Sequence, residues 1–254
     1  MSRATTVTAA CTLAILFAHV SFADGAAPPV LPARSLPAAQ TKPKGRLFPP
    51  QDLGLLEAQD RDQWQKPEQI MDTLGIADGS IVADLGAGGG WFTIRLARRV
   101  GPNGVVYAED IQPQMIEAIG RRVRREGLSN VRTVLGTPDD PRLPPGIDTV
   151  LIVDAYREMG DPRAPATIVT LLRNVARSLK PQGRIGVVDF NPGGGGPGPA
   201  PEDRVDPQSV IDTAAAAGLR LIAREAVPPF VFLLVFAKDG SESPTRDTKV
   251  RESR

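Results

Sequence analysis

Cysteine and histidine are almost missing from this sequence. Among its 254 residues there is one of each, Cys11 and His19, and both lie in an N-terminal stretch that we expect to be removed. A chain without them forms no disulfide, thiol nucleophile, Ser-His triad or Cys/His zinc site. We therefore expect no metal centre, and any general base must be Asp, Glu, Lys or Tyr.

The sequence also has no large excess of positive or negative charge. Lys and Arg number 30 and Asp and Glu number 29, so no basic field attracts nucleic acid, and we expect no nucleic-acid partner. Aromatic side chains make up 5% of the chain, whereas Gly and Pro number 25 each. That excess of Gly and Pro predicts that part of the chain is not packed.

The N-terminus has the pattern of a secretory signal peptide over residues 1–23. Arg3 precedes an apolar run from about Ala9 to Ala18, and Ser21-Phe22-Ala23 has small residues at both positions that a signal peptidase reads. The run is too short for a comfortable transmembrane span. We expect cleavage after Ala23 and a periplasmic or secreted protein with no stable membrane span. An uncleaved N-terminal membrane anchor is the alternative.

Composition divides the remainder into three parts. Residues 24–50 are rich in Pro and Ala and predict a disordered linker. Residues 51–238 carry the regular apolar patterns of a globular domain. Residues 239–254 mix charges of both signs and predict a disordered tail.

Short apolar runs alternate with helical patterns across the globular part. The strands predicted from them are Ile81–Leu85, Val105–Asp110, Val131–Leu135, Thr149–Val153, Arg184–Phe190, Arg220–Ala226 and Val231–Ala237. The clearest helical stripe is formed by Ile168, Leu171, Leu172, Val175 and Leu179, and "KPQG" ends it. This alternation predicts a doubly wound α/β fold with a mostly parallel sheet and helices on both faces. Only "VPP" separates the last two strands, so they pair antiparallel.

The segment Asn191–Asp203, "NPGGGGPGPAPED", follows the fifth predicted strand. Its Gly and Pro content excludes a packed helix or strand. Two interpretations remain open: a mobile loop beside a site, or a surface loop without function.

The first predicted strand leads into Gly86-Ala87-Gly88-Gly89-Gly90 and then a helix. In doubly wound folds, ligands bind outside the carboxyl ends of the strands. Glycines there let backbone N–H groups approach a ligand closely. This glycine pattern is compatible with three interpretations: a dinucleotide site, a methyl-donor site and a plain tight turn.

Three neighbouring residues separate these alternatives. A dinucleotide fingerprint needs a small third residue where Trp91 stands. Asp84 would repel a pyrophosphate but suits an ammonium group. Glu109-Asp110 ends the second strand, where a carboxylate can bind both ribose hydroxyls. The ligand therefore has a ribose and a cationic amino-acid part but no pyrophosphate, which describes S-adenosylmethionine (SAM).

Four segments resemble the successive motifs of class I SAM-dependent methyltransferases. They are "VADLGAGGGWFTIRLA", "VVYAEDIQPQMIEAI", "DTVLIVDAYREM" and "LKPQGRIGVVDF", within a resemblance over about Arg61 to Ala237. The segments "RDQWQKPEQIMDTLGI" and "PPFVFLLVFAK" also resemble secreted bacterial methyltransferase-domain proteins. The resemblance implies a Rossmann-like, seven-stranded sheet with an antiparallel last strand, SAM as cofactor, and methyl transfer as the activity.

The resemblance also implies roles for particular residues. The methionine end of SAM would lie against Asp84, Gly86, Ala87, Gly88 and Gly90. Asp110 would hold the ribose, with Glu109 as its rival, Ile111 would touch the adenine, and Asp139 or Asp140 would lie near the adenine amino group.

Candidate catalytic residues on the acceptor side are Asp154, Tyr156 and Glu158. Asp154 would face the methyl group, and Tyr156 either faces the sulfonium or packs under a loop. Arg157 and Glu158 stand where related proteins often have histidines. We expect a small-molecule acceptor of unspecified chemistry. The alternatives are an exported non-catalytic binding module and, less compatible with Trp91 and Asp84, a nicotinamide-dependent oxidoreductase.

Signal cleavage is directly testable. Mass spectrometry of the protein from its native host should find a mature N-terminus near Asp24, because Ser21-Phe22-Ala23 forms the expected cleavage site. A soluble cytosolic product that still begins at Met1 or Ser2 would contradict this prediction.

Overall fold

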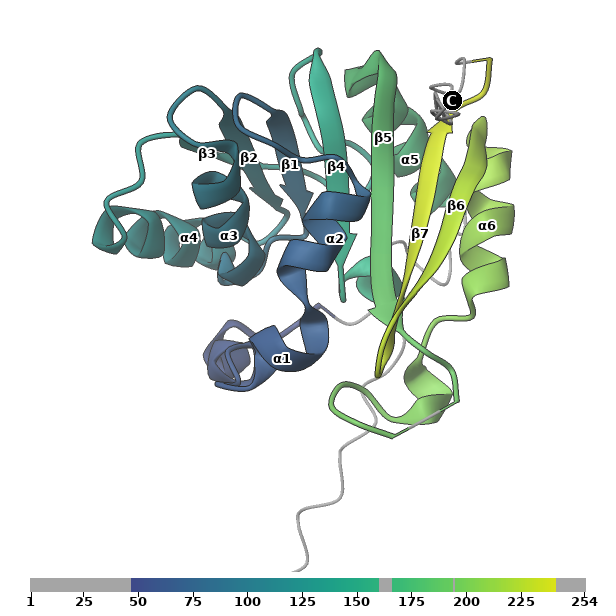
Figure 1. The fold of residues 1–254 in the computed structure, drawn as a ribbon, viewed down its shortest axis with the longest axis horizontal. Coiled ribbons are helices and arrows are strands. Elements are labelled where there is room, and N and C mark those ends of the chain that lie inside the picture. Colours follow the sequence, from purple (N-terminus) through teal and green to yellow (C-terminus); the bar gives the residue numbers. More distant parts are fainter. Residues whose placement is uncertain (1–46, 160–165, 194, 241–254) are drawn as a thin grey trace, which may run out of the picture. The chain divides into compact units, whose positions relative to one another are not determined.

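A computed structural model describes residues 47–159, 166–193 and 195–240. Figure 1 shows them as a single sheet flanked by helices. The predicted signal peptide (1–23), residues 24–46 of the predicted linker and residues 241–254 of the predicted tail lie outside the described residues.

The sheet has seven strands in the order β3-β2-β1-β4-β5-β7-β6. Their bounds are β1 Ile81–Leu85, β2 Val105–Asp110, β3 Val131–Leu135, β4 Ile147–Val153, β5 Leu179–Phe190, β6 Leu219–Val227 and β7 Val231–Lys238. Strands β1 to β5 pair in parallel, and β7 pairs antiparallel with both β5 and β6. The predicted fold class and the antiparallel pairing of the last two strands are confirmed.

Helices cover both faces of the sheet (Figure 1). Their bounds are α1 Arg61–Gln65, α2 Pro67–Thr73, α3 Trp91–Val100, α4 Pro113–Arg125, α5 Ala166–Ser178 and α6 Pro207–Ala216, with short 3-10 helices η1 Pro50–Leu56, η2 Tyr156–Glu158 and η3 Pro201–Asp203. Buried apolar side chains of α1 to α4 form one core cluster, and those of α5 and α6 form a second. None of the helices within the described ranges combines the length and the apolar character that crossing a membrane requires.

Strands β4 to β7 each extend beyond the predicted bounds, and three further differences concern helices and the linker. The helical stripe was expected to include Leu179, but α5 ends at Ser178 and Leu179 pairs with Ile147 as the first residue of β5. The predicted linker was expected to be disordered up to Pro50, yet the Phe48 amide donates a hydrogen bond to Glu158. Helix α1 was not predicted, because five residues are too few for a helical period to appear.

The Gly/Pro-rich segment after β5 is organised around one side chain, Arg204. Its guanidinium donates to the carbonyl oxygens of Asn191, Gly195, Pro197 and Pro199 at 2.9 to 3.3 Å. Its centre lies 5.4 Å from the centroid of the Phe190 ring, just before the segment. The described residues of this segment therefore wrap a cation that satisfies four of their backbone carbonyls, and the segment ends in the short 3-10 helix η3.

Close packing also explains the glycines of this segment. A Cβ at Gly196 would overlap the Phe230 ring, and one at Gly198 would overlap the Phe190 ring. Both glycines have positive φ, at 71° and 94°. Glycine is required here for close approach and for the backbone conformation together.

Replacing Arg204 by Lys should lower the free energy of unfolding by about 1–3 kcal/mol, because an ammonium cannot bond four carbonyls in the plane that a guanidinium fills. Arg173→Lys is the matched control, since Arg173 donates to one carbonyl, that of Ala216, and should cost less than about 1 kcal/mol. Urea denaturation measures both. Equal losses in the two variants would contradict the role assigned to Arg204.

Candidate functional site

The turn between β1 and α3 carries the glycines singled out in the sequence. Gly86, Gly88 and Gly90 have φ values of 75°, 54° and 78°. A Cβ at Gly86 would come within 2.9 Å of the side chains of Ala155 and Met159. The turn is therefore bare for two reasons: its backbone conformation favours glycine, and a neighbouring loop packs directly on it.

Strand β2 fixes the shape of this turn. The amides of Gly86 and Ala87 both donate to the Glu109 carbonyl, at 3.0 and 2.8 Å. The Gly88 amide donates to Asp110 Oδ2 at 3.0 Å, and the Gln112 amide donates to Asp110 Oδ1 at 2.9 Å. Asp110 thus connects the glycine turn to the start of α4, and the backbone amide of Ile111 also acts on its carboxylate.

Two further carboxyl groups lie beneath the turn. Asp84 is buried and accepts a 2.6 Å hydrogen bond from the Thr93 hydroxyl; burial raises its pKa to about 6. Glu109 is buried and accepts from the Gly86 amide at 3.3 Å; burial and the neighbouring Asp110 raise its pKa to about 8. Glu109 is therefore largely neutral at pH 7, and its side chain supports the turn from inside the protein.

The end of β4 presents Asp154 in a left-handed conformation, with φ 55°. Its Oδ2 accepts a 2.8 Å bond from Arg61 Nη2, and both side chains are largely buried. Burial raises the pKa of Asp154, while the positive charge of Arg61 opposes the rise. Arg61 also donates from Nε to Gln65 Oε1 at 3.2 Å. A residue of α1 thus neutralises the carboxylate predicted to face the methyl group.

Residues 47–57, which we name the N-terminal cover, lie across the same site. The Phe48 amide donates to Glu158 Oε2, and Gln112 Nε2 donates to the Phe48 carbonyl, both at 3.1 Å. Arg122 Nη1 bonds Glu57 Oε1 at 2.5 Å. Leu53 lies against Gly89, 3.2 Å from where a Cβ would stand. The cover thereby connects the ends of β2 and β4 with α4.

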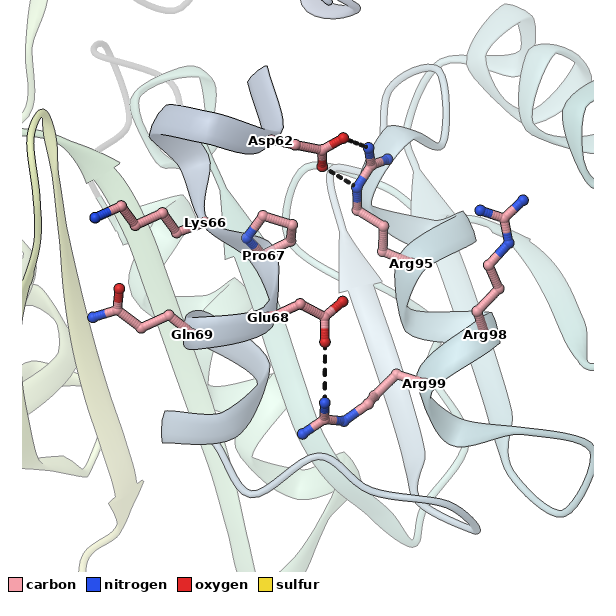
Figure 2. A pocket seen from close by; sticks show the side chains of 8 residues that line it. All are labelled: Asp62, Lys66, Pro67, Glu68, Gln69, Arg95, Arg98 and Arg99. Atoms are coloured by element: carbon pink, nitrogen blue, oxygen red, sulfur yellow. Dashed lines mark hydrogen bonds and ion pairs between the residues drawn. The ribbon is translucent and has the colours of Figure 1, made fainter. Parts of the chain in front are cut away.

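Helix α1, which carries Arg61, is anchored on α3. Figure 2 shows Asp62 bonding Arg95 through both carboxylate oxygens, at 2.8 and 2.7 Å, and Glu68 of α2 bonding Arg99 at 3.0 Å. The Arg95 guanidinium carbon also lies 3.4 Å from the centroid of the Trp91 ring, and that of Arg61 lies 4.3 Å from it. The first residue of α3 therefore contacts both arginines that fix α1.

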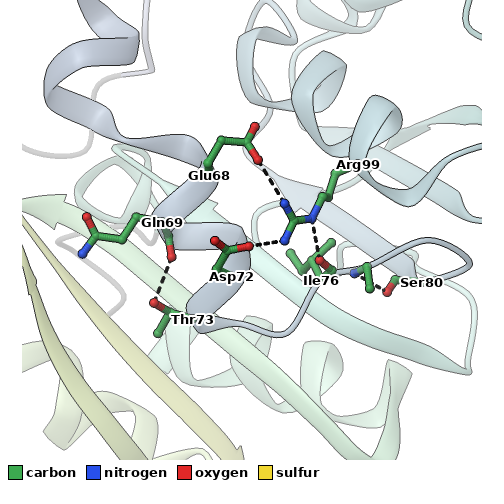
Figure 3. A network of polar contacts seen from close by, with 8 residues as sticks. Glu68, Gln69, Asp72, Thr73, Ile76, Ser80 and Arg99 are labelled. Carbon is green, nitrogen blue, oxygen red and sulfur yellow. Dashed lines mark hydrogen bonds and ion pairs between the residues drawn. The ribbon is translucent and has the colours of Figure 1, made fainter.

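A second set of contacts holds α2. Figure 3 shows Arg99 bonded to Glu68, to Asp72 and to the Ile76 carbonyl. The hollow of about 630 Å³ beside α2 and α3 is lined by Lys66, three arginines and the carboxylates of Asp62 and Glu68. Each of the three arginines pairs with a carboxylate, and the pairs of Arg95 with Asp62 and of Arg99 with Glu68 attach α1 and α2 to α3.

The pocket at the glycine turn has a volume of about 70 Å³. Of the residues predicted for the site, it is lined by Asp84, Gly86, Ala87, Gly88, Asp154 and Glu158. Lining residues that the sequence analysis did not assign to the site are Glu57, Arg61, Gly89, Trp91, Phe92, Val153 and Ala155. Arg61 could not be found from the sequence, because it reaches Asp154 across 93 positions of the chain.

The other predicted residues lie outside this lining. Asp110 contacts the turn through Gly88, and Gly90 is the N-cap of α3. Ile111 is half-buried next to Asp110. Asp139 is exposed and accepts from the Thr137 hydroxyl at 2.8 Å. Tyr156 is buried in the core cluster formed with α5 and α6, which is the packing alternative for this residue. In the described ranges no group of three or more potential metal ligands occurs.

The sheet order and the bare turn at its carboxyl edge define the class: a doubly wound, Rossmann-like ligand-binding domain. Residues 82–183 match the family described as Methyltransferase domain. Together with the relatives and the solved structure below, this match shows that residues 82–183 are similar to the methyltransferase domain of SAM-dependent methyltransferases.

Two relatives illustrate the range of the family. The chain is 32% identical over 159 residues to the nocamycin O-methyltransferase of Saccharothrix syringae, covering 63% of this chain and 52% of the relative. It is 32% identical over 123 residues to the ubiquinone/menaquinone biosynthesis C-methyltransferase UbiE of Pasteurella multocida (strain Pm70), covering 48% and 44%. The chain thus spans about half the length of these relatives.

A solved structure matches over more of the chain. The SAM-dependent methyltransferase from Aquifex aeolicus has a TM-score of 0.69 and 25% sequence identity, covering 75% of this chain and 98% of that one. A second solved structure, named a putative type 11 methyltransferase, from Sulfolobus solfataricus, has a TM-score of 0.54 at 21% identity and supports the fold alone.

Glu109 should make stability depend on pH. Its pKa is about 8 in the folded protein against an ordinary value of 4.5, so the native state binds the proton more tightly. The free energy of unfolding should therefore fall as pH rises from about 4.5 to 8, by on the order of a few kcal/mol. Glu109→Gln cannot ionise and should show a clearly smaller fall in urea denaturation across this range.

The matched control is Glu117→Gln, on the exposed side of α4, which should keep the wild-type pH dependence. If Glu109→Gln lost as much stability between pH 5 and 8 as the wild type does, ionisation of Glu109 would not be the cause.

Proposed function

We propose that this protein transfers the methyl group of SAM to a small-molecule acceptor outside the cytosol. The observation that carries the proposal is the bare turn Gly86–Gly90 with Asp84 beneath it, inside the part of the chain that matches the methyltransferase family. The proposed location rests on the signal pattern of residues 1–23. The absence of nucleic-acid partners rests on the balanced charge.

The residues present fit the parts of SAM. The turn offers bare backbone for the methionine end, and Asp84 and Asp154 offer carboxylates near an ammonium or sulfonium. Asp110 can accept hydrogen bonds from the two ribose hydroxyls while it still holds the Gly88 and Gln112 amides. In this assignment Glu109 supports the turn, and Asp110 contacts the ligand.

Binding requires the N-terminal cover to shift. Small-molecule sites typically have volumes of about 300 Å³ or more, whereas this pocket has about 70 Å³. The cover lies beside it and is attached through polar contacts of Phe48 and Glu57 to Glu158, Gln112 and Arg122. Movement of the cover admits the ligand without disturbing the strand ends.

Methyl transfer from SAM requires little chemical assistance from the protein. SAM supplies an activated methyl group on a sulfonium, so the chain's residues mainly align the acceptor and balance charge. Asp154 and Glu158 are placed to do so at the pocket. The rival function, a non-catalytic binding module, is favoured by one observation: the Arg61–Asp154 pair closes the methyl side of the pocket.

Binding of SAM tests the assignment. Asp110→Ala removes a charge-assisted partner of the ribose, each such bond being worth about 1.5–3 kcal/mol, so affinity should fall about tenfold to a few hundredfold. Gly88→Val should abolish binding, because a β-branched side chain fills the ligand's approach at a positive φ. Glu109→Ala is the control and should change affinity much less.

Calorimetry measures these affinities, and thermal melts exclude unfolding. Tryptophan fluorescence reports changes at the pocket, because Trp64 and Trp91 are the two tryptophans of the chain and both neighbour Arg61, which lines it. Wild-type protein that binds no SAM at millimolar concentration would refute the proposed function. Wild-type binding with no release of S-adenosylhomocysteine for any acceptor would favour the binding module.

A further inference from the structure

Unpaired polar atoms gather where β4 and β5 end. Within the described ranges, five buried side-chain nitrogen or oxygen atoms have no hydrogen-bond partner, and four of them belong to Trp64, Gln65, Asp154 and Asp189. The fifth is the Tyr156 hydroxyl, in the core cluster with α5 and α6. Buried polar atoms without partners are rare in proteins, so such a group indicates the position of a polar ligand.

Two of these residues, Asp154 and Asp189, lie next to each other at the edge of the sheet. Val153 lies opposite Val188 in the β4–β5 ladder, so Asp154 and Asp189 follow at neighbouring strand ends, about 5 Å apart in the direction of pairing. Gln65 lies near enough to Asp154 to lower its pKa. Trp64 is on the other face, where its ring lies 5.5 Å from that of Phe190.

This group adjoins the donor pocket through Asp154, which lines both. It also has an excess of negative charge. The charged groups that face it are Arg61 from α1, Asp84 from β1, Asp154, Arg157 and Glu158 after β4, and Asp189 from β5. Four carboxyl groups against two guanidinium groups favour a cationic acceptor over an anionic one.

The unpaired atoms limit the chemical class of the methyl acceptor further. Asp154 Oδ1 and Asp189 Oδ2 are both acceptors and need hydrogens from the ligand. A hydroxyl group offers one hydrogen, whereas a protonated amine offers two or three. Resting on the methyltransferase function proposed above, we propose that the methyl acceptor is an amine that binds between Asp154 and Asp189, and that Asp189 accepts its proton.

The step balances as follows. Asp189 takes a proton from the ammonium and becomes a neutral carboxylic acid, which leaves the amine nitrogen with a lone pair. That lone pair forms a bond to the methyl carbon while the carbon–sulfur bond breaks. The bonding electrons go to sulfur, and the products are the methylated ammonium and S-adenosylhomocysteine. Asp189 then releases its proton to solvent.

Asp189 is better suited than Asp154 to accept the proton. Asp154 Oδ2 is paired with Arg61 at 2.8 Å, which stabilises its ionised form. Asp189 has no such cation in contact; its Oδ1 accepts from its neighbour's amide, that of Phe190, at 2.8 Å. Burial and the charge of Asp154 raise the pKa of Asp189 to about 7, which suits a base that works near neutral pH.

Three probes of one skeleton test the proposal on the full-length protein: benzylamine, benzyl alcohol and benzoate, each with SAM. Release of S-adenosylhomocysteine should depend on benzylamine and be at least tenfold slower with the other two. Asp189→Asn should lower the amine-dependent rate by about 10²-fold or more and leave SAM affinity within twofold. Asp212→Asn, an exposed carboxylate of α6, should leave both unchanged.

The pH profile of the wild-type protein tests the role of Asp189 even if the Asp189→Asn variant does not fold. In the wild type the amine-dependent rate should rise with pH through about 7, since Asp189 must be ionised to act. No preference for the amine, an Asp189→Asn variant as fast as the wild type, or a flat pH profile would overturn the proposal. Failure of the wild type to bind SAM would instead refute the methyltransferase function itself, so the two failures are distinguishable.

Discussion

The site depends on backbone amides of the glycine turn being held by the end of the neighbouring strand. The Glu109 carbonyl and the Asp110 carboxylate together receive the amides of Gly86, Ala87 and Gly88. This is geometrically feasible because Leu85 pairs with Glu109 in the parallel ladder. A register shift of one residue would move the side chains of Glu109 and Asp110 each to the other face of the sheet. The shape of the glycine turn, which we propose to hold the methionine end of SAM, is therefore a consequence of strand pairing as well as of glycine content.

The methyl side is built differently, from parts distant in sequence. Arg61 lies on a five-residue helix that is too short to be stable alone, and its position relies on ion pairs with α3 and on stacking against Trp91. The two sides of the pocket are therefore held by different kinds of contact. The donor side is fixed by main-chain bonds within the sheet, and the acceptor side is fixed by side chains on a small attached element, where movement costs less.

The sequence predicted the parts whose signals are local. Strands β1 to β3 have the predicted bounds, because each is a short apolar run ended by turn residues. Contacts between distant segments could not be read, such as Arg61 with Asp154 or Phe48 with Glu158. Arg204 gives no signal either, since one arginine bonded to backbone carbonyls leaves no pattern in the sequence. The glycine turn could be located from composition alone, whereas the N-terminal cover could be located only from the fold.

The position of β7 has a consequence for how the chain is made. Among the described residues β6 finds its ladder partner in β7 alone, and β7 inserts between β6 and β5. Until β7 leaves the ribosome, β6 has no partner in this sheet and β5 keeps an open edge. The β5–β7 pairing joins segments distant in the sequence, and such pairings form late. The sheet therefore stays open beside β5 until nearly all of its strands have been synthesised.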